Sequence, residues 1–107
     1  MNNQKLIEMV RERVLEQIQP ERLILFGSRA RGDERPDSDV DLLVVMETDA
    51  PQYRRSLPIR RALRGLPVGV DIIVYTPEEF CDWQGASLSL VSRAMREGRE
   101  LYVREAA

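Results

Sequence analysis

The sequence predicts an α/β (α+β) domain in which helices pack on a single mixed sheet of three to four strands. Short apolar runs bounded by turn residues alternate with segments whose apolar residues recur at helical spacing. The chain has 107 residues, of which 43% are hydrophobic, and this suits one domain over residues 1–107 with a single core. Its one cysteine excludes an intrachain disulfide, so the core itself must supply the stability.

The first half of the chain is expected to form a helix and two strands. Apolar residues three and four apart predict an amphipathic helix over residues 4–19, which Pro20 ends. Two short apolar runs predict buried strands over residues 22–26 and 40–46. The polar segment that joins these strands is expected to hold one short helical turn capped by Ser28.

The second half is expected to alternate helices with two further strands. A helical pattern over residues 53–65 contains a proline, which must begin a helix or kink one. Residues 68–75 alternate as a third strand, and Thr76 then opens a capping-box sequence with proline at the first helical position. A last apolar stripe predicts a helix that ends near Gly98, and residues 101–103 are expected to add an edge strand.

Composition removes several classes of function. The chain has no histidine, which excludes a Ser-His-Asp triad, a Cys-His dyad and a histidine-based zinc site. A net charge of −2 argues against a domain that coats nucleic acid through bulk positive charge. No apolar run approaches the ~18 residues of a membrane span, and no signal-peptide pattern is present, so we expect a soluble cytoplasmic protein without a membrane partner.

Three aspartates carry the candidate chemistry. Asp39 and Asp41 flank Val40, and because strand side chains alternate, both carboxylates leave one face with their Cα atoms about 7 Å apart. Converging like charges need a cation, and all-oxygen ligands favour Mg²⁺ or Mn²⁺ over zinc. Asp71 joins them if its strand lies beside theirs, which would make a metal-assisted phosphoryl-transfer site. Taken alone, such a pair is more often a solvated strand end.

A glycine-serine turn supplies the complementary half of this site. Gly27 lets the backbone approach a phosphate, and Ser28 offers its N–H and hydroxyl to the same anion. Arg29 and Arg31 follow and are expected to spread the charge of a bound triphosphate. Alone, Gly-Ser is ordinary turn chemistry, so the joint pattern carries the functional interpretation.

That joint pattern resembles a known family. Gly27-Ser28, ten residues and then Asp39-Val40-Asp41 opening an apolar strand is similar to the signature of the nucleotidyltransferase superfamily that includes DNA polymerase beta. The small size and the S-D-V-D-L-L-V sequence make the chain most similar to the minimal nucleotidyltransferases (MNT). The resemblance implies the nucleotidyltransferase fold, a mixed sheet with helices on one side.

The resemblance also implies roles for individual residues. Asp39 and Asp41 would hold two Mg²⁺ ions, or Mn²⁺, and Asp71 would complete the metal and catalytic site. Gly27 and Ser28 would hold the β and γ phosphates of a nucleoside triphosphate, ATP in the first instance, while an acceptor hydroxyl attacks the α phosphorus.

Three functions follow from this resemblance. Minimal nucleotidyltransferases are often paired with a helical HEPN toxin and act as its antitoxin by transferring AMP to a tyrosine, so Mg²⁺-dependent protein adenylylation is our first hypothesis. The second is a non-catalytic binding module that neutralises a toxin by occlusion. The third is transfer to a small-molecule or RNA hydroxyl, which the small size and the pI of about 5.2 disfavour.

Three further features have simpler interpretations. One eleven-residue segment without any acid is rich in arginine: Arg54, Arg55, Arg60, Arg61 and Arg64. A solvated helix face is its simplest interpretation, and a docking surface for an acidic partner, RNA or the outgoing pyrophosphate is the alternative. Trp83 is expected in the core, or else as an anchor for a partner, and Cys81 as a small buried hydrophobe.

Overall fold

A four-stranded mixed sheet forms the centre of the computed structural model, which describes residues 2–86 and 89–105. The strand order is β3-β2-β1-β4, with β1 antiparallel to both β2 and β4 and with β2 parallel to β3. The strands are β1 (Arg22–Phe26), β2 (Val40–Val45), β3 (Val70–Tyr75) and β4 (Arg99–Val103). The predicted α+β fold class, the single mixed sheet and its closing edge strand are confirmed.

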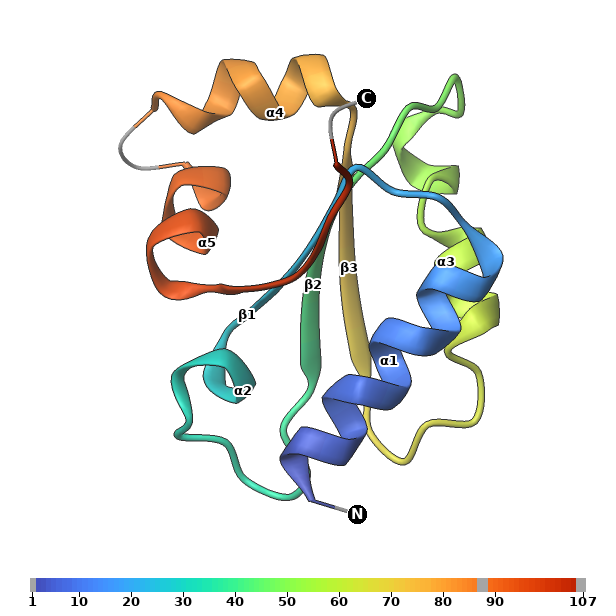
Figure 1. Ribbon diagram of the computed structural model, residues 1–107, viewed down its shortest axis with the longest axis vertical. Helices are drawn as coiled ribbons and strands as arrows, with labels where there is room; N and C mark the ends of the chain where they lie inside the picture. Colours follow the sequence, from blue (N-terminus) through green and yellow to red (C-terminus); the bar gives the residue numbers. More distant parts are fainter. Residues whose placement is uncertain (1, 87–88, 106–107) are drawn as a thin grey trace.

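Helices cover both faces of this sheet, as Figure 1 shows. α1 and α3 lie on one face, and α4 and α5 lie on the other. The helical segments are α1 (Asn3–Gln17), α2 (Ser28–Arg31), the 3-10 turn η1 (Gln52–Arg54), α3 (Leu57–Ala62), α4 (Pro77–Gln84) and α5 (Leu90–Glu97). The expectation of helices on one side only is wrong, because both faces of the central strands are apolar and each needs cover.

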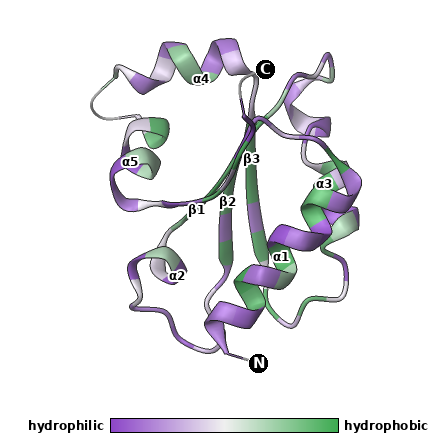
Figure 2. Ribbon diagram, viewed as in Figure 1, coloured by the Kyte–Doolittle hydropathy of each residue, from purple (hydrophilic) through white to green (hydrophobic). Residues whose placement is uncertain are grey.

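Two hydrophobic clusters lie on opposite faces of the sheet, and successive residues of each strand alternate between them. Leu42 and Val74 belong to the cluster under α1 and α3, whereas Leu43 and Val45 belong to the cluster with Phe80 under α4 and α5. Figure 2 shows the hydrophobic residues running along β2 and β3, while α1 alternates between hydrophobic and hydrophilic residues. Odd-numbered residues of β2 and β3 therefore face the α4–α5 side.

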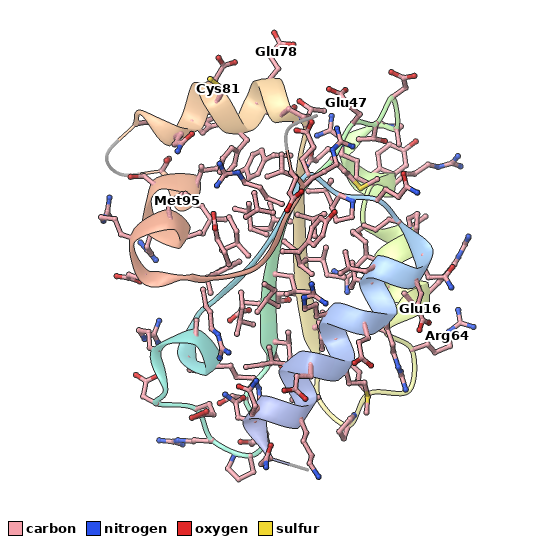
Figure 3. The ribbon with its side chains drawn as sticks, in the orientation of Figure 1. Glu16, Glu47, Arg64, Glu78, Cys81 and Met95 are labelled. Carbon is pink, nitrogen blue, oxygen red and sulfur yellow. The ribbon has the colours of Figure 1, made fainter. Side chains whose placement is uncertain are left out.

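Several local expectations differ from the structure. Ser28 is the first residue of α2 and not its cap, since Gly27 occupies the cap position without a side-chain hydrogen bond. Trp83 is 52% exposed and Cys81 is exposed, contrary to the expected burial; Figure 3 places Cys81 on the outer side of α4. The reason is that α4 rests on the sheet through Phe80, its single buried residue. None of the described helices is both long and apolar enough to cross a membrane.

The N-terminus of α4 carries the predicted capping box. The Thr76 hydroxyl accepts the Glu79 N–H at 3.2 Å, and Glu79 Oε1 accepts the Thr76 N–H at 2.8 Å. Glu79 Oε1 also accepts a hydrogen bond from Arg55 Nη1 at 2.6 Å. The Thr76 N–H and then the Arg55 guanidinium hold the pKa of Glu79 below its ordinary value, because both stabilise the ionised form.

Replacing Thr76 with alanine should lower the free energy of unfolding by about 1 kcal/mol, because the Glu79 N–H loses the hydroxyl that accepts its hydrogen bond. The depressed pKa of Glu79 adds a pH dependence: its contribution is present above its ordinary value of 4.5 and is lost as the pH falls. Urea unfolding of wild type, T76A and E79Q between pH 7 and pH 3 measures both effects. An E79Q protein that loses as much stability on acidification as wild type would contradict this assignment.

Candidate active site

Two aspartates lie side by side at the start of β2 and β3. The strands pair in parallel with Asp41 opposite Asp71, and both residues face the α4–α5 side of the sheet. Asp39 stands two residues before Asp41, so alternation directs it to the same side. The expectation that Asp71 joins this face is confirmed by the register.

Burial and repulsion perturb the carboxyl of Asp41. Its pKa is raised to about 6 by burial, by the charge of Asp71, by a side-chain hydrogen bond to Asp71 and by the charge of Asp39. The guanidinium of Arg31 acts in the opposite direction. Asp41 therefore keeps its proton to a higher pH than an ordinary aspartate, and a cation between the converging carboxylates would relieve their repulsion.

Two glycines form the backbone wall behind the carboxylates. A Cβ atom on Gly27 would collide with the carboxylate of Asp41, and one on Gly69 would lie 2.6 Å from Oδ1 of Asp39. Gly27 also has φ of +76° and ψ of −162°, a region almost restricted to glycine. Sequence reasoning missed Gly69; a glycine directly before a strand, two residues ahead of an aspartate, was the available signal.

The close contact is a pair and not a trio. Within the described residues, no three Asp, Glu, Cys or His side chains are arranged to hold a metal ion together. The chemistry of the donors nevertheless fits a hard cation, since carboxylate oxygens are the ligands that Mg²⁺ and Mn²⁺ prefer. Asp41 and Asp71 are the pair in contact, and Asp39 adds its charge from the same side.

The glycine-serine turn lies beside Asp41. Phe26, the last residue of β1, pairs with Asp41, so Gly27 and Ser28 follow directly at this edge. The main-chain oxygen of Gly27 accepts the N–H groups of Ala30 and Arg31, each at 3.1 Å, which closes α2. The first N–H groups of a helix have no intrahelical acceptor and suit an anion. Turn and carboxylates thus form one continuous polar edge.

The two arginines of this turn differ. Arg31 is exposed, lies 3.4 Å from Asp33 and lowers the pKa of Asp41, so it is accessible beside the carboxylates. Arg29 is only 5% exposed and directs its guanidinium to main-chain oxygens of the following loop. The structure therefore does not bring Arg29 to the surface where a triphosphate was expected, because its donors are engaged inside the protein.

The arginine-rich segment is also partly structural. Arg55 donates to the main-chain oxygens of Ala50 and Val74 and pairs with Glu79, while Arg60 donates to the main-chain oxygen of Val70 at 3.0 Å. These two side chains tie η1 and α3 to β3. On a solvated helix face the guanidinium donors would point to water, whereas some donors of Arg55 and Arg60 are already engaged within the protein.

Comparison with known proteins agrees with this geometry. The sequence model of the nucleotidyltransferase domain matches residues 5–101. The chain belongs to the nucleotidyltransferase domain family. The crystal structure of a candidate nucleotidyltransferase from Sulfolobus solfataricus aligns over 95% of this chain and 84% of its own, at 26% identity and a TM-score of 0.67. No curated protein matches the sequence significantly.

Toxin–antitoxin structures share the fold of this nucleotidyltransferase domain. One, crystallised with AMP-PNP, aligns over 98% of this chain and 76% of its own, at 21% identity and a TM-score of 0.55. A variant of the toxin–antitoxin complex MntA–HpeT aligns over the same shares, at 19% identity and a TM-score of 0.61. At these identities the likeness concerns the fold alone.

Proposed function

We propose that this nucleotidyltransferase domain transfers AMP from ATP to a hydroxyl of a partner protein in a Mg²⁺-dependent reaction, and that it is the antitoxin of a HEPN toxin. The observation that carries the proposal is the parallel register of Asp41 and Asp71 beside the Gly27-Ser28 turn. It assembles acidic groups and an anion-binding turn at one edge, as metal-assisted phosphoryl transfer requires.

Each residue of the site has its own role in the proposed reaction. Gly27 and Ser28 hold the β and γ phosphates, and the exposed Arg31 offsets their charge. Asp39 and Asp41 would hold the divalent ions, with Asp71 beside them. Bound Mg²⁺ neutralises phosphate charge and polarises the α phosphorus. The buried Arg29 is left out of the nucleotide-contacting group that its sequence position suggested.

In the proposed transfer one bond to the α phosphorus forms as another breaks. The acceptor oxygen forms a bond to the α phosphorus, the bond from that phosphorus to the β-phosphate oxygen breaks, and pyrophosphate leaves. The carboxylate of Asp71 accepts the proton of the attacking hydroxyl. The acceptor is a tyrosine hydroxyl of the partner in this proposal.

Two further observations support a toxin as the partner protein. Two structures with this fold are toxin–antitoxin complexes, and one of them was crystallised with AMP-PNP, an ATP analogue. Trp83, 52% exposed on α4, offers this chain an aromatic anchor for such a protein. The same exposure favours the second candidate, a module that neutralises a toxin by occlusion without catalysis.

Incubation with Mg²⁺, α-labelled ATP and the product of the adjacent reading frame tests the proposal. We expect label on a tyrosine of that protein and release of pyrophosphate. A D39N/D41N double variant should bind the partner but transfer nothing, because asparagine keeps the volume and removes the metal-binding charge. Absence of label at saturating nucleotide contradicts the enzymatic proposal, and a double variant that still protects cells from the toxin supports occlusion.

A further inference from the structure

Arg29 is a buried cation that has no carboxylate partner among the residues that the structure describes. It is 5% exposed, and the ion pairs found among the described residues do not include it. A guanidinium removed from water is costly unless hydrogen bonds to its N–H groups replace the lost hydration. The acceptors around Arg29 must therefore replace the water that its guanidinium loses on burial.

All but one of those acceptors belong to one four-residue turn, residues 35–38. Nε of Arg29 donates to the main-chain oxygen of Ser38 at 2.9 Å, and Nη2 donates to those of Pro36 at 3.1 Å and Arg35 at 3.5 Å. Nη1 donates to Oδ1 of Asn3 at 2.9 Å, and Nδ2 of Asn3 donates back to the main-chain oxygen of Arg29 at 3.3 Å. We call this set of contacts the Arg29 clamp.

The clamped turn leads directly into the metal-binding candidates. The Ser38 N–H donates to the main-chain oxygen of Arg35 at 3.0 Å, and the Ser38 hydroxyl accepts the Arg35 N–H at 2.8 Å. Asp39 is the next residue, and the Val40 N–H then donates to the main-chain oxygen of Gly69 at 2.9 Å. Between the clamp and the sheet, Asp39 is held from both sides.

Packing alone does not hold this turn. A groove of about 460 Å³ lies behind it, lined among others by Leu6, Pro36 and Val68. The groove separates part of the turn from α1 and from the segment before β3, and the hydrogen bonds of the clamp tie the turn to α1 and α2. Because Arg29 follows Ser28 in α2, the same residue connects the phosphate-binding turn to the segment that carries Asp39.

We infer that Arg29 is a positioning residue, which fixes the carboxylate of Asp39 against that of Asp41 by holding residues 35–38 through its guanidinium. This inference rests on the proposed function, since the purpose of fixing Asp39 is to bind the divalent ion with the nucleotide. Arg29 touches neither nucleotide nor metal in this assignment. Its planar fork of donors reaches several main-chain oxygens at once, which a lysine ammonium cannot do.

R29K keeps the charge and loses the fork, and N3A removes only the contact to α1. Arg55 offers the matched control, because its side chain is 12% exposed and likewise donates to two main-chain oxygens, at the opposite end of β3. Three measurements compare wild type, R29K, N3A and R55K. They are thermal unfolding, amide hydrogen exchange at Ser38 and Val40, and affinity for Mn²⁺ in the presence of AMP-PNP.

We expect R29K to weaken Mn²⁺ binding by about 10- to 100-fold, the range for residues that orient metal ligands, and N3A to weaken it by a few fold. R55K should lose comparable thermal stability and keep its Mn²⁺ affinity within about twofold of wild type. The Ser38 and Val40 amides should exchange faster in R29K and N3A but not in R55K.

Unchanged exchange at Ser38 and Val40 in R29K would overturn the inference whatever the protein binds. Mn²⁺ affinities in R29K and N3A that equal those of R55K would overturn it as well, and would leave Arg29 a purely stabilising residue. Wild type that binds no Mn²⁺ with AMP-PNP would instead contradict the proposed function, and with it the purpose given to the clamp.

Discussion

Replacing Asp41 with asparagine is expected to reduce nucleotidyl transfer by about 1,000-fold, because the variant loses a charge that would stabilise both the divalent ion and the transition state. The neighbouring backbone accommodates the new side chain, since asparagine has the volume of aspartate. Transfer is measured as release of pyrophosphate at saturating Mg²⁺ and ATP. A loss of less than tenfold would place the metal elsewhere.

The same variant should be more stable than wild type when no metal is present. Burial and repulsion raise the pKa of Asp41 from 3.8 to about 6, so the folded state keeps a proton that the unfolded chain releases. Relative to the ionised form, protonated Asp41 therefore stabilises the folded state. This stabilisation is complete below the ordinary pKa of 3.8 and is lost as the pH rises through about 6. Allowing for solvent screening, D41N should gain about 1 kcal/mol at pH 8 and nothing at pH 4. Urea unfolding in EDTA measures both values.

Replacing Gly27 with alanine should abolish nucleotide binding and also destabilise the fold. The added Cβ would collide with the carboxylate of Asp41, and φ of +76° is strained for alanine. We expect a loss of about 2 kcal/mol in the free energy of unfolding. Binding of AMP-PNP with Mg²⁺ should fall by at least about 100-fold, because Asp41 must move away from its partner.

Gly65 provides the control for backbone strain. It has φ of +90°, but a Cβ there would meet nothing within 4 Å. G65A should therefore lose about 1 kcal/mol of stability and bind AMP-PNP as wild type does. Equal nucleotide affinities in G27A and G65A would show that the approach of Gly27 to Asp41 has no functional consequence.

The carboxylate edge was predictable because it follows from strand periodicity. Alternation alone puts Asp39 and Asp41 on one face, and only the pairing of β2 with β3 remained to be learned for Asp71. The sequence also contained the signal that helices cover both faces of the sheet. The consecutive apolar residues from Leu42 to Val45 leave no polar face, yet the family resemblance suggested helices on one side.

Arg29 and Arg31 show where sequence reasoning ended. They stand two residues apart in the same polar turn, and nothing local distinguishes the exposed side chain from the buried one. The difference arises because residues 35–38 fold back over α2 and present main-chain oxygens to Arg29. Trp83 is a similar case: its exposure depends on how much of α4 the sheet reaches, and composition does not encode that.

Calorimetric titration of the wild-type protein with AMP-PNP, with Mn²⁺ and then in EDTA, measures the central claim most directly. If the aspartates at the start of β2 and β3 bind a nucleotide through divalent ions, AMP-PNP should bind with Mn²⁺ and fail to bind in EDTA, and the D39N/D41N variant should bind in neither condition. Equal affinity with and without Mn²⁺, or undiminished affinity in the double variant, would contradict the account.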